Sequence, residues 1–260
     1  MLTYPEFDPV ALSLGPFKVR WYGVMYLIGF AGGWWAARSR VRDLALAWTD
    51  DQVSDLLFFV ALGVVLGGRV GYVLFYNFGA FLDDPLMLLR VWEGGMSFHG
   101  GLLGVLAAVL WHGRSTGRGF FELTDFVAPV VPIGLGAGRL GNFINGELWG
   151  KATDVTWAFL VDGVPRHPTQ LYELILEGVV MFTVLMWYGR RPRPTMAISG
   201  LFAVMYGAFR CLVELWRLPD AHIGYLDGRW VTMGMVLSLP LIAVGALLMH
   251  LAHRTPAPHA

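Results

Sequence analysis

The sequence is poor in charged residues. Of its 260 residues, 15% are charged, against roughly 25% in an average soluble domain. Hydrophobic residues make up 56% of the chain, and its mean hydropathy is +0.55. Such a chain has too few polar side chains to cover the surface of a water-soluble globule. An ordinary soluble domain is therefore excluded, and an integral membrane protein is indicated.

Cysteine and net charge exclude further classes of protein. The one cysteine, Cys211, cannot form an internal disulfide or a metal site built on several thiolates. The 19 basic and 19 acidic residues give a formal net charge of zero, so the chain has no general attraction to nucleic acid. The first 20 residues lack the basic stretch and apolar core of a signal peptide. We therefore expect no cleavable signal peptide and no nucleic-acid partner.

Long apolar runs recur along almost the whole chain, and each is long enough to cross ~30 Å of hydrocarbon. The runs are 21–37, 56–78, 94–111, 123–140, 171–188, 195–215 and 230–251. Only helices satisfy the backbone over such lengths in lipid, because a closed barrel would show short alternating segments instead. The sequence thus predicts an all-α, polytopic membrane bundle of about seven transmembrane helices.

The links between these runs indicate how the chain is oriented. Arginines gather after the first, third and fifth runs, and basic residues favour the cytoplasmic side. With seven spans, the N-terminus then lies outside and the C-terminus in the cytoplasm. We expect residues 1–260 to form a single membrane-embedded domain, with a loop region on the outer (periplasmic) side around 138–170.

Ionisable residues within the apolar runs are the strongest pointers to a site. Arg69, His99, Arg139 and Arg210 all lie in or at the ends of these runs, where a charge is tolerated only if it faces protein or water. Several arginines suggest an anionic ligand, but internal ion pairs that stabilise helix packing are an equally good explanation for each. The carboxylates available for such pairs are Asp55, Asp125, Glu173, Glu177 and Glu214. Of these, Glu214 follows Arg210 by four residues and so shares its helix face.

The segment GRLGNFINGELWG at 138–150 places polar side chains between glycines. Glycines let the backbone approach a ligand closely, while Arg139, Asn142, Asn145 and Glu147 supply donors and one carboxylate. The topology brings this segment to the outer side together with His99. A glycine-rich turn with solvated polar residues is the simpler alternative. If the site transfers protons, His99 is the first candidate base and Glu147 the second, although a histidine in an apolar helix is more often a packing residue.

The segment 138–150 resembles the signature of the bacterial prolipoprotein diacylglyceryl transferases, and five further landmarks follow in that family's order. They are RWYGVMY at 20–26, LGGRVGYVLFY at 66–76, GGMSFHGGLLG at 94–104, HPTQLYE at 167–173 and YGAFRCLVELWRLPD at 206–220. The resemblance spans nearly the whole chain. The departures are small: Met235 stands where a glutamine is expected, and Leu218 varies a loosely kept position.

The resemblance implies a membrane enzyme with two substrates. It implies transfer of the sn-1,2-diacylglyceryl group of phosphatidylglycerol to the thiol of the lipobox cysteine in a prolipoprotein signal peptide. The products would be a thioether and glycerol 1-phosphate, as the first step of bacterial lipoprotein maturation in the cytoplasmic (inner) membrane. Neither a metal nor an organic cofactor is implied, because the chemistry is one displacement on a membrane lipid. Since the attacking sulfur belongs to the substrate, Cys211 is expected to be a packing residue.

The same resemblance implies roles for individual residues. On the phosphate side, Arg139 binds the headgroup phosphate, Asn142 and Asn145 lie beside it in the substrate site, and Arg210 stabilises the leaving phosphate. On the thiol side, Tyr22 and His99 line the site and His99 takes the proton, while Glu147 orders the headgroup loop or a water. The residues expected to hold the arginine cluster at the substrate site are Arg69, Glu214 and Arg217.

Three other functions are compatible with the same intramembrane arginines and sequence motifs. A transporter or channel for an anionic solute or lipid would also need intramembrane arginines, although inverted repeats, which are common in transporters, are not evident in this sequence. A lipoprotein-handling partner without enzymatic activity would bind lipid through the same arginines. A different phospholipid-dependent transferase would use an oxygen or nitrogen nucleophile in place of the thiol.

Overall fold

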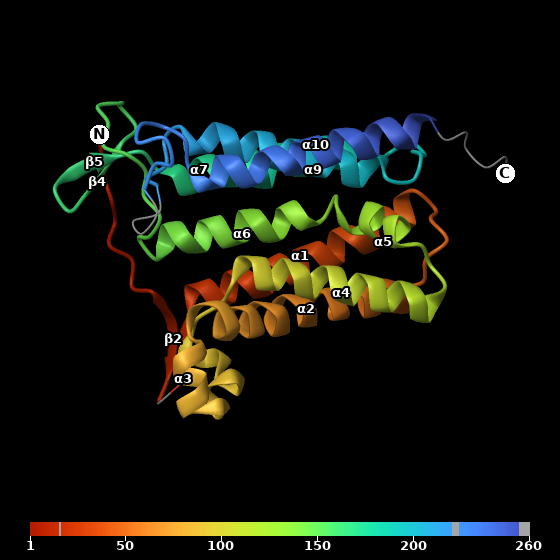
Figure 1. Cartoon of the computed structure of the whole chain (residues 1–260), viewed down its shortest axis with the longest axis horizontal. Coiled ribbons are helices and arrows are strands. Elements are labelled where there is room, and N and C mark those ends of the chain that lie inside the picture. The colour runs from red at the N-terminus through yellow and green to blue at the C-terminus, as the bar shows by residue number, and fades with distance from the viewer. Residues whose placement is uncertain (16, 220–223, 255–260) are drawn as a thin grey trace. The chain divides into compact units, whose positions relative to one another are not determined.

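The computed structural model describes residues 1–15, 17–219 and 224–254. The chain is mostly helical (Figure 1). It divides into two compact units. The first unit comprises Met1–Ala36 and Asp125–Ala260, and the second comprises Ala37–Thr124. Helix α1, Trp21–Asp43, begins in the first unit and ends in the second.

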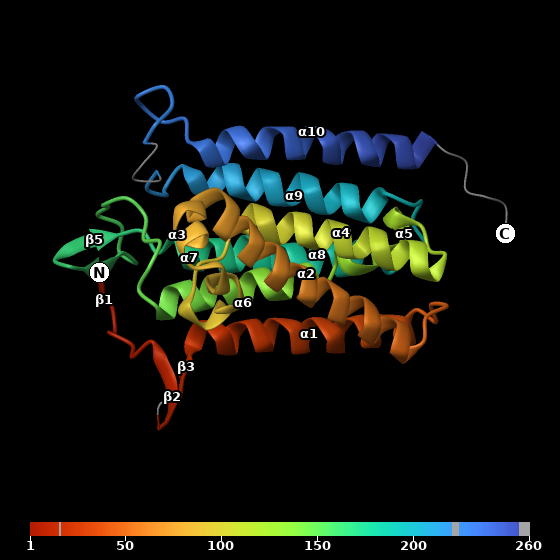
Figure 2. The same ribbon diagram turned by 60° about the horizontal axis from the view of Figure 1, so that its bottom comes forward.

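The first unit contains most of the helices. After α1 they are α5 (Phe120–Val127, shared with the second unit), α6 (Val131–Ile144), α7 (Thr169–Glu173), the π-helical segment η3 (Leu174–Val180), α8 (Met181–Tyr188), α9 (Ala197–Glu214) and α10 (Met233–Arg254). Helices α9 and α10 lie side by side (Figure 2). Their contact is close, because a Cβ atom on Gly200 would lie 2.8 Å from the carbonyl oxygen of Gly245. A core of Ala128, Met181, Leu185 and Ile198 joins the end of α5 to α8 and α9.

Two small sheets also belong to the first unit, and the all-α expectation did not include them. Strand β1 (Leu2–Thr3) pairs in parallel with β4 (Phe159–Val161), which pairs antiparallel with β5 (Val164–Arg166). Their register sets Leu2 opposite Phe159 and Val161 opposite Val164. Strands β2 (Val10–Leu14) and β3 (Phe17–Arg20) form an antiparallel hairpin. These strands are too short to give a clear alternating pattern in the sequence.

The second unit is built on two tightly packed helices. They are α2 (Asp50–Tyr76) and α4 (Phe98–Thr116), and the chain between them forms α3 (Phe78–Asp83) and two 3₁₀ turns, η1 (Pro85–Leu89) and η2 (Val91–Glu93). A Cβ atom on Gly63 would lie 2.6 Å from the carbonyl oxygen of Gly104. The two backbones therefore touch where side chains are absent, as small-residue helix interfaces in membranes do.

Four stretches of helix are long and apolar enough to cross a membrane. They are α2, the continuous Thr169–Tyr188 stretch from α7 to α8, α9 and α10. The pair α5 and α6, bent by 50°, raises the number to five if it forms one span. Pro129 follows α5 and Pro132 lies in the first turn of α6, where proline is tolerated because that turn lacks backbone partners. Among the described residues, α1 and α4 also coincide with expected runs but are not among the helices that meet the length and hydropathy criteria.

Candidate active site

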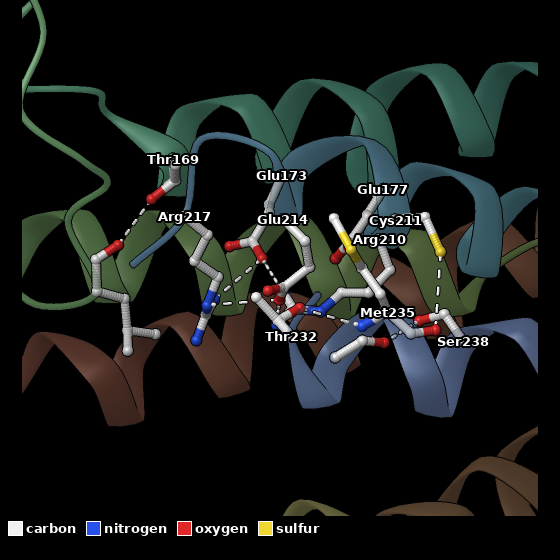
Figure 3. A network of polar contacts seen from close by, with 12 residues as sticks. Thr169, Glu173, Glu177, Arg210, Cys211, Glu214, Arg217, Thr232, Met235 and Ser238 are labelled. Carbon is white, nitrogen blue, oxygen red and sulfur yellow. Dashed lines mark hydrogen bonds and ion pairs between the residues drawn. The ribbon is translucent and has the colours of Figure 1, made fainter. Parts of the chain in front are cut away.

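Three arginines and three glutamates form a charged cluster within the first unit. The six residues are Arg139 on α6, Glu173 at the end of α7, Glu177 in η3, Arg210 and Glu214 on α9, and Arg217 just after α9. Glu173 is its centre, because this one carboxylate contacts all three arginines. Figure 3 shows Arg210 and Arg217 directed toward Glu173 and Glu214.

The distances within the cluster distinguish its arginines. Arg210 forms close ion pairs with both Glu173 and Glu214. Nη1 of Arg217 lies 3.2 Å from Glu173 Oε1, and its Nε lies 3.8 Å from Glu214 Oε1. Arg139 is held at longer range, with Nε 3.3 Å from Glu173 Oε2 and Nη2 3.5 Å from Glu177 Oε2. Arg210 is thus bound firmly between two carboxylates, while Arg139 is bound more loosely.

Burial divides the cluster into an inner and an outer layer. The side chains of Glu173 and Glu177 are 0% exposed and that of Glu214 is 3% exposed. The arginine side chains keep between 12% and 18% of their surface. Buried charges are stable only when they are paired, and three positive charges here meet three negative ones. The buried glutamates therefore pair with three guanidinium groups that are themselves partly exposed.

Local structure explains why these side chains meet. Glu173 and Glu177 share one continuous helical stretch, and Arg210 and Glu214 are four residues apart on α9. Arg217 is fixed by a backbone bridge to Gly150. There a Cβ atom on Gly150 would lie 2.6 Å from the carbonyl oxygen of Trp216, so only glycine permits this approach.

The glycine-rich segment 138–150 begins within α6 and ends at Gly150, which forms the backbone bridge to Arg217. Nδ2 of Asn142 donates to Glu147 Oε1 at 2.7 Å, and Nδ2 of Asn145 lies 3.4 Å from the same oxygen. Gly146 has a φ of +69°, in the left-handed region that favours glycine. This turn lets the backbone N–H of Glu147 donate to the carbonyl oxygen of Asn142. Both asparagines thus hold the exposed Glu147 carboxylate in place.

Two further contacts anchor the segment. The hydroxyl of Tyr4 donates to the carbonyl oxygen of Phe143 at 2.7 Å, at the end of α6. The hydroxyl of Thr169 donates to the carbonyl oxygen of Leu148 at 2.8 Å, at the start of α7 (Figure 3). Tyr22 packs against Gly141, where a Cβ atom would come within 3.1 Å of its ring, and interacts electrostatically with Arg139 and Glu147.

A buried histidine lies beside this segment. Trp157 donates its indole N–H to the Tyr172 hydroxyl at 2.7 Å, and that hydroxyl lies 3.0 Å from Nδ1 of His167. Because an indole only donates, the Tyr172 proton is free for His167, whose Nδ1 then accepts. Burial lowers the pKa of His167 below its ordinary value, and nearby Lys151 lowers it further. Both effects favour the neutral form of His167.

The remaining candidates from the sequence lie in the second unit. His99 is exposed in the first turn of α4, two residues after the N-cap Ser97. Arg69 is buried on α2 and donates to the carbonyl oxygens of Met87, Leu88, Gly94 and Gly95. These carbonyls belong to the segment between α3 and α4, and the guanidinium of Arg69 also lies 5.7 Å from the centre of the Tyr72 ring. The proposed roles of His99 and Arg69 at the substrate stay predictions.

The structure adds three residues to the candidate site that were not among the expected site residues. Glu173 and Glu177 stood in the sequence only as carboxylates available for pairing, and Tyr206 was not singled out. The phenol of Tyr206 interacts electrostatically with Arg139 and Glu177. The sequence did contain a signal for Glu173 and Glu177. Both carboxylates lie in the apolar run 171–188, and intramembrane charges are costly and usually functional. Within the described part of the chain, no group of three His, Cys, Asp or Glu side chains could hold a metal ion.

Comparison with known proteins decides the family. The family model described as prolipoprotein diacylglyceryl transferase matches residues 9–251. The chain belongs to the prolipoprotein diacylglyceryl transferase family. The match includes both the charged cluster and the glycine-rich segment, so the site described above lies inside the diacylglyceryl transferase domain.

Curated relatives agree over nearly the whole length. A phosphatidylglycerol–prolipoprotein diacylglyceryl transferase of Azotobacter vinelandii is 59% identical over 261 residues, covering 99% of this chain and 98% of that protein. Its counterpart in Ectopseudomonas mendocina is 57% identical over 258 residues, covering 98% of this chain and 97% of that protein. One from Pseudomonas fluorescens is 55% identical over 264 residues, covering 99% and 97%. The diacylglyceryl transferase resemblance of the sequence motifs is thereby confirmed.

Proposed function

We propose that this chain transfers the diacylglyceryl group of phosphatidylglycerol to the thiol of a prolipoprotein lipobox cysteine. The products are a thioether and glycerol 1-phosphate. The names of the relatives support both substrates. The observation that carries the proposal is the cluster of three partly open arginines, backed by buried glutamates, among membrane-type helices. Such a cluster suits a lipid phosphodiester, which is anionic and gains charge as its ester bond to the diacylglyceryl group breaks.

The phosphate side of the reaction is assigned to α6 and α9. Arg139 binds the headgroup phosphate, because it is loosely held by its carboxylates and partly open. Arg210 stabilises the leaving phosphate, since a guanidinium keeps its charge and acts strongly in a dry site. Asn142 and Asn145 hold Glu147, which orders the headgroup or a water beside it. Glu214 and Arg217 hold Arg210 and Glu173 in place.

The thiol side is assigned to Tyr22 and His99. A cysteine thiol with a pKa near ~8.5 is mostly protonated at neutral pH and needs a base to become a nucleophile. The imidazole of His99 takes this proton, and the thiolate attacks the glyceryl carbon that carries the phosphate. Arg69 donates to the carbonyl oxygens of Met87 and Leu88, and its role is to hold the arginine cluster in place. No metal or organic cofactor takes part.

The membrane arrangement of the proposal follows the arginine distribution. One domain of 1–260 crosses the bacterial inner membrane about seven times, with its N-terminus outside and its C-terminus in the cytoplasm. The site and the loop region around 138–170 then face the periplasmic side. Cysteine-accessibility labelling of single-cysteine variants from the six links between spans would test this topology.

The decisive experiment mixes the purified protein with phosphatidylglycerol and a lipobox peptide in detergent. Mass spectrometry should detect both a diacylglyceryl-modified cysteine and released glycerol 1-phosphate. A matched peptide with serine at the lipobox position should stay unmodified. Lipid binding without either product would refute the transferase and favour a transporter or a lipid-binding partner.

A further inference from the structure

Glu177 is the most weakly held carboxylate of the charged cluster. It is completely buried, and its Oε2 lies 3.5 Å from Nη2 of Arg139, whereas charge-assisted N–H···O bonds are ordinarily about 2.7–2.9 Å. Its Oε1 has no hydrogen-bond partner among residues 1–15, 17–219 and 224–254. By contrast, Glu173 contacts three arginines and Glu214 contacts two.

Arg139, the partner of Glu177, has donors that its two carboxylates leave unused. Its Nε points to Glu173 and its Nη2 to Glu177. Within the described part of the chain, its Nη1 forms neither a hydrogen bond nor an ion pair. Because a guanidinium carries five N–H donors in a plane, Nη1 is free to meet a phosphate oxygen.

Binding of an anion to Arg139 changes the net charge of the cluster. The three arginines and three ionised glutamates sum to zero, so a phosphodiester would bring the cluster to a net charge of minus one. It would also place a third anion around Arg139, beside Glu173 and Glu177. An uncompensated charge in a buried membrane site is unfavourable. A proton bound to one of the two glutamates restores the balance.

The surroundings favour Glu177 as the carboxylate that takes this proton. Its charged and titratable neighbours are Arg139 on α6, Arg210 and Tyr206 on α9, and Glu173 on its own span. Glu173 would lose three ion pairs on protonation, and Glu177 only its long contact with Arg139. Glu177 also lies in the π-helical segment η3, a feature that is frequent at functional sites.

We propose that Glu177 is an exchangeable counter-ion of Arg139, which takes up a proton from solvent when an anionic phosphodiester headgroup binds and releases it when the lipid leaves. This inference rests on the proposed function, because it takes phosphatidylglycerol as the ligand of Arg139. In the empty site, Glu177 neutralises Arg139. In the lipid complex, the phosphate replaces that charge.

The test measures proton uptake directly. Short-chain phosphatidylglycerol is titrated calorimetrically into the purified full-length protein, in two buffers of different ionisation enthalpy at the same pH. The difference in heat gives the protons bound per lipid. We expect up to one proton for the wild type, and an affinity that falls by up to about tenfold per pH unit as the pH rises. Glu177→Gln should bind without proton uptake and with little pH dependence, while the exposed control Glu6→Gln should match the wild type.

Infrared difference spectra of the wild type supply a second readout that needs no variant to fold. Lipid binding should produce the carbonyl band of a protonated carboxylic acid, and this band should be absent in Glu177→Gln. Binding and transfer without proton uptake between about pH 6 and about pH 9 would overturn the inference and leave the transferase intact. Uptake that persists in Glu177→Gln would overturn the assignment to Glu177. A wild type that binds no phosphatidylglycerol would overturn the proposed function itself.

Discussion

Glu173 is completely buried and contacts three arginines, so Glu173→Gln removes the central negative charge of the cluster while keeping the shape of the side chain. Three positive charges would then face two negative ones inside the bundle. Removing one partner of a buried ion pair costs about 3–5 kcal/mol, because it leaves an uncompensated charge. Arg210 and Arg217 would also lose their shared anchor, and we expect transfer to fall at least ~100-fold, the range seen when a donor to the transition state is misplaced.

Stability is measured by titrating the purified protein with a denaturing detergent in mixed micelles, with tryptophan fluorescence as the signal. Activity is measured in the same samples from the rate of peptide modification. The control is Glu122→Gln, because Glu122 pairs with Arg118 four residues away and its side chain is 46% exposed. Such surface pairs contribute about 0.2–1 kcal/mol. If Glu173→Gln were as stable as this control, the reasoning from buried charge would be refuted.

Three further changes test other parts of the site and the fold. Arg139→Ala should lower transfer at least ~100-fold in the peptide assay, and wild-type turnover would overturn its assignment to the phosphate. Cys211→Ser should keep nearly full activity in that assay, because the attacking sulfur comes from the peptide; complete loss would mean that Cys211 is the nucleophile. Gly104→Leu should lower the yield of folded protein by size-exclusion chromatography, since its Cβ would overlap the carbonyl oxygen of Gly63. Gly134→Ala, whose Cβ would meet nothing within 4 Å, should fold normally.

The positions of the helices were largely predictable from hydropathy. The runs 195–215 and 230–251 correspond to α9 and α10 within three residues, and the run 56–78 corresponds to α2, which begins six residues earlier. The run 171–188 corresponds to the stretch from α7 to α8, but nothing in its pattern indicated the π-helical segment η3. An apolar run reports burial in lipid and not the hydrogen-bond pattern of the backbone, so a local change from α to π geometry is invisible in it.

The candidate site was predictable in part. The spacing of Arg210 and Glu214 indicated a pair on one helix face, and the structure contains it. The contacts of Arg69 with backbone carbonyls could not be predicted, because such contacts leave no mark in the identity of the residues that supply them. Strand β1 was also missed, since it pairs with a strand more than 150 residues away.

The sequence by itself determined that the chain is a membrane protein of the diacylglyceryl transferase family and that its arginines at membrane depth matter. These conclusions depend on composition and on the order of short motifs, which are local properties. Apart from the Arg210–Glu214 pair, only the tertiary structure decided which carboxylate pairs with which arginine. Arg210 and Arg217 lie 37 and 44 residues from Glu173, and they meet it only because α7 and α9 pack together. Ion pairing acts over a few ångströms, so it follows the packing of helices and not their order along the chain.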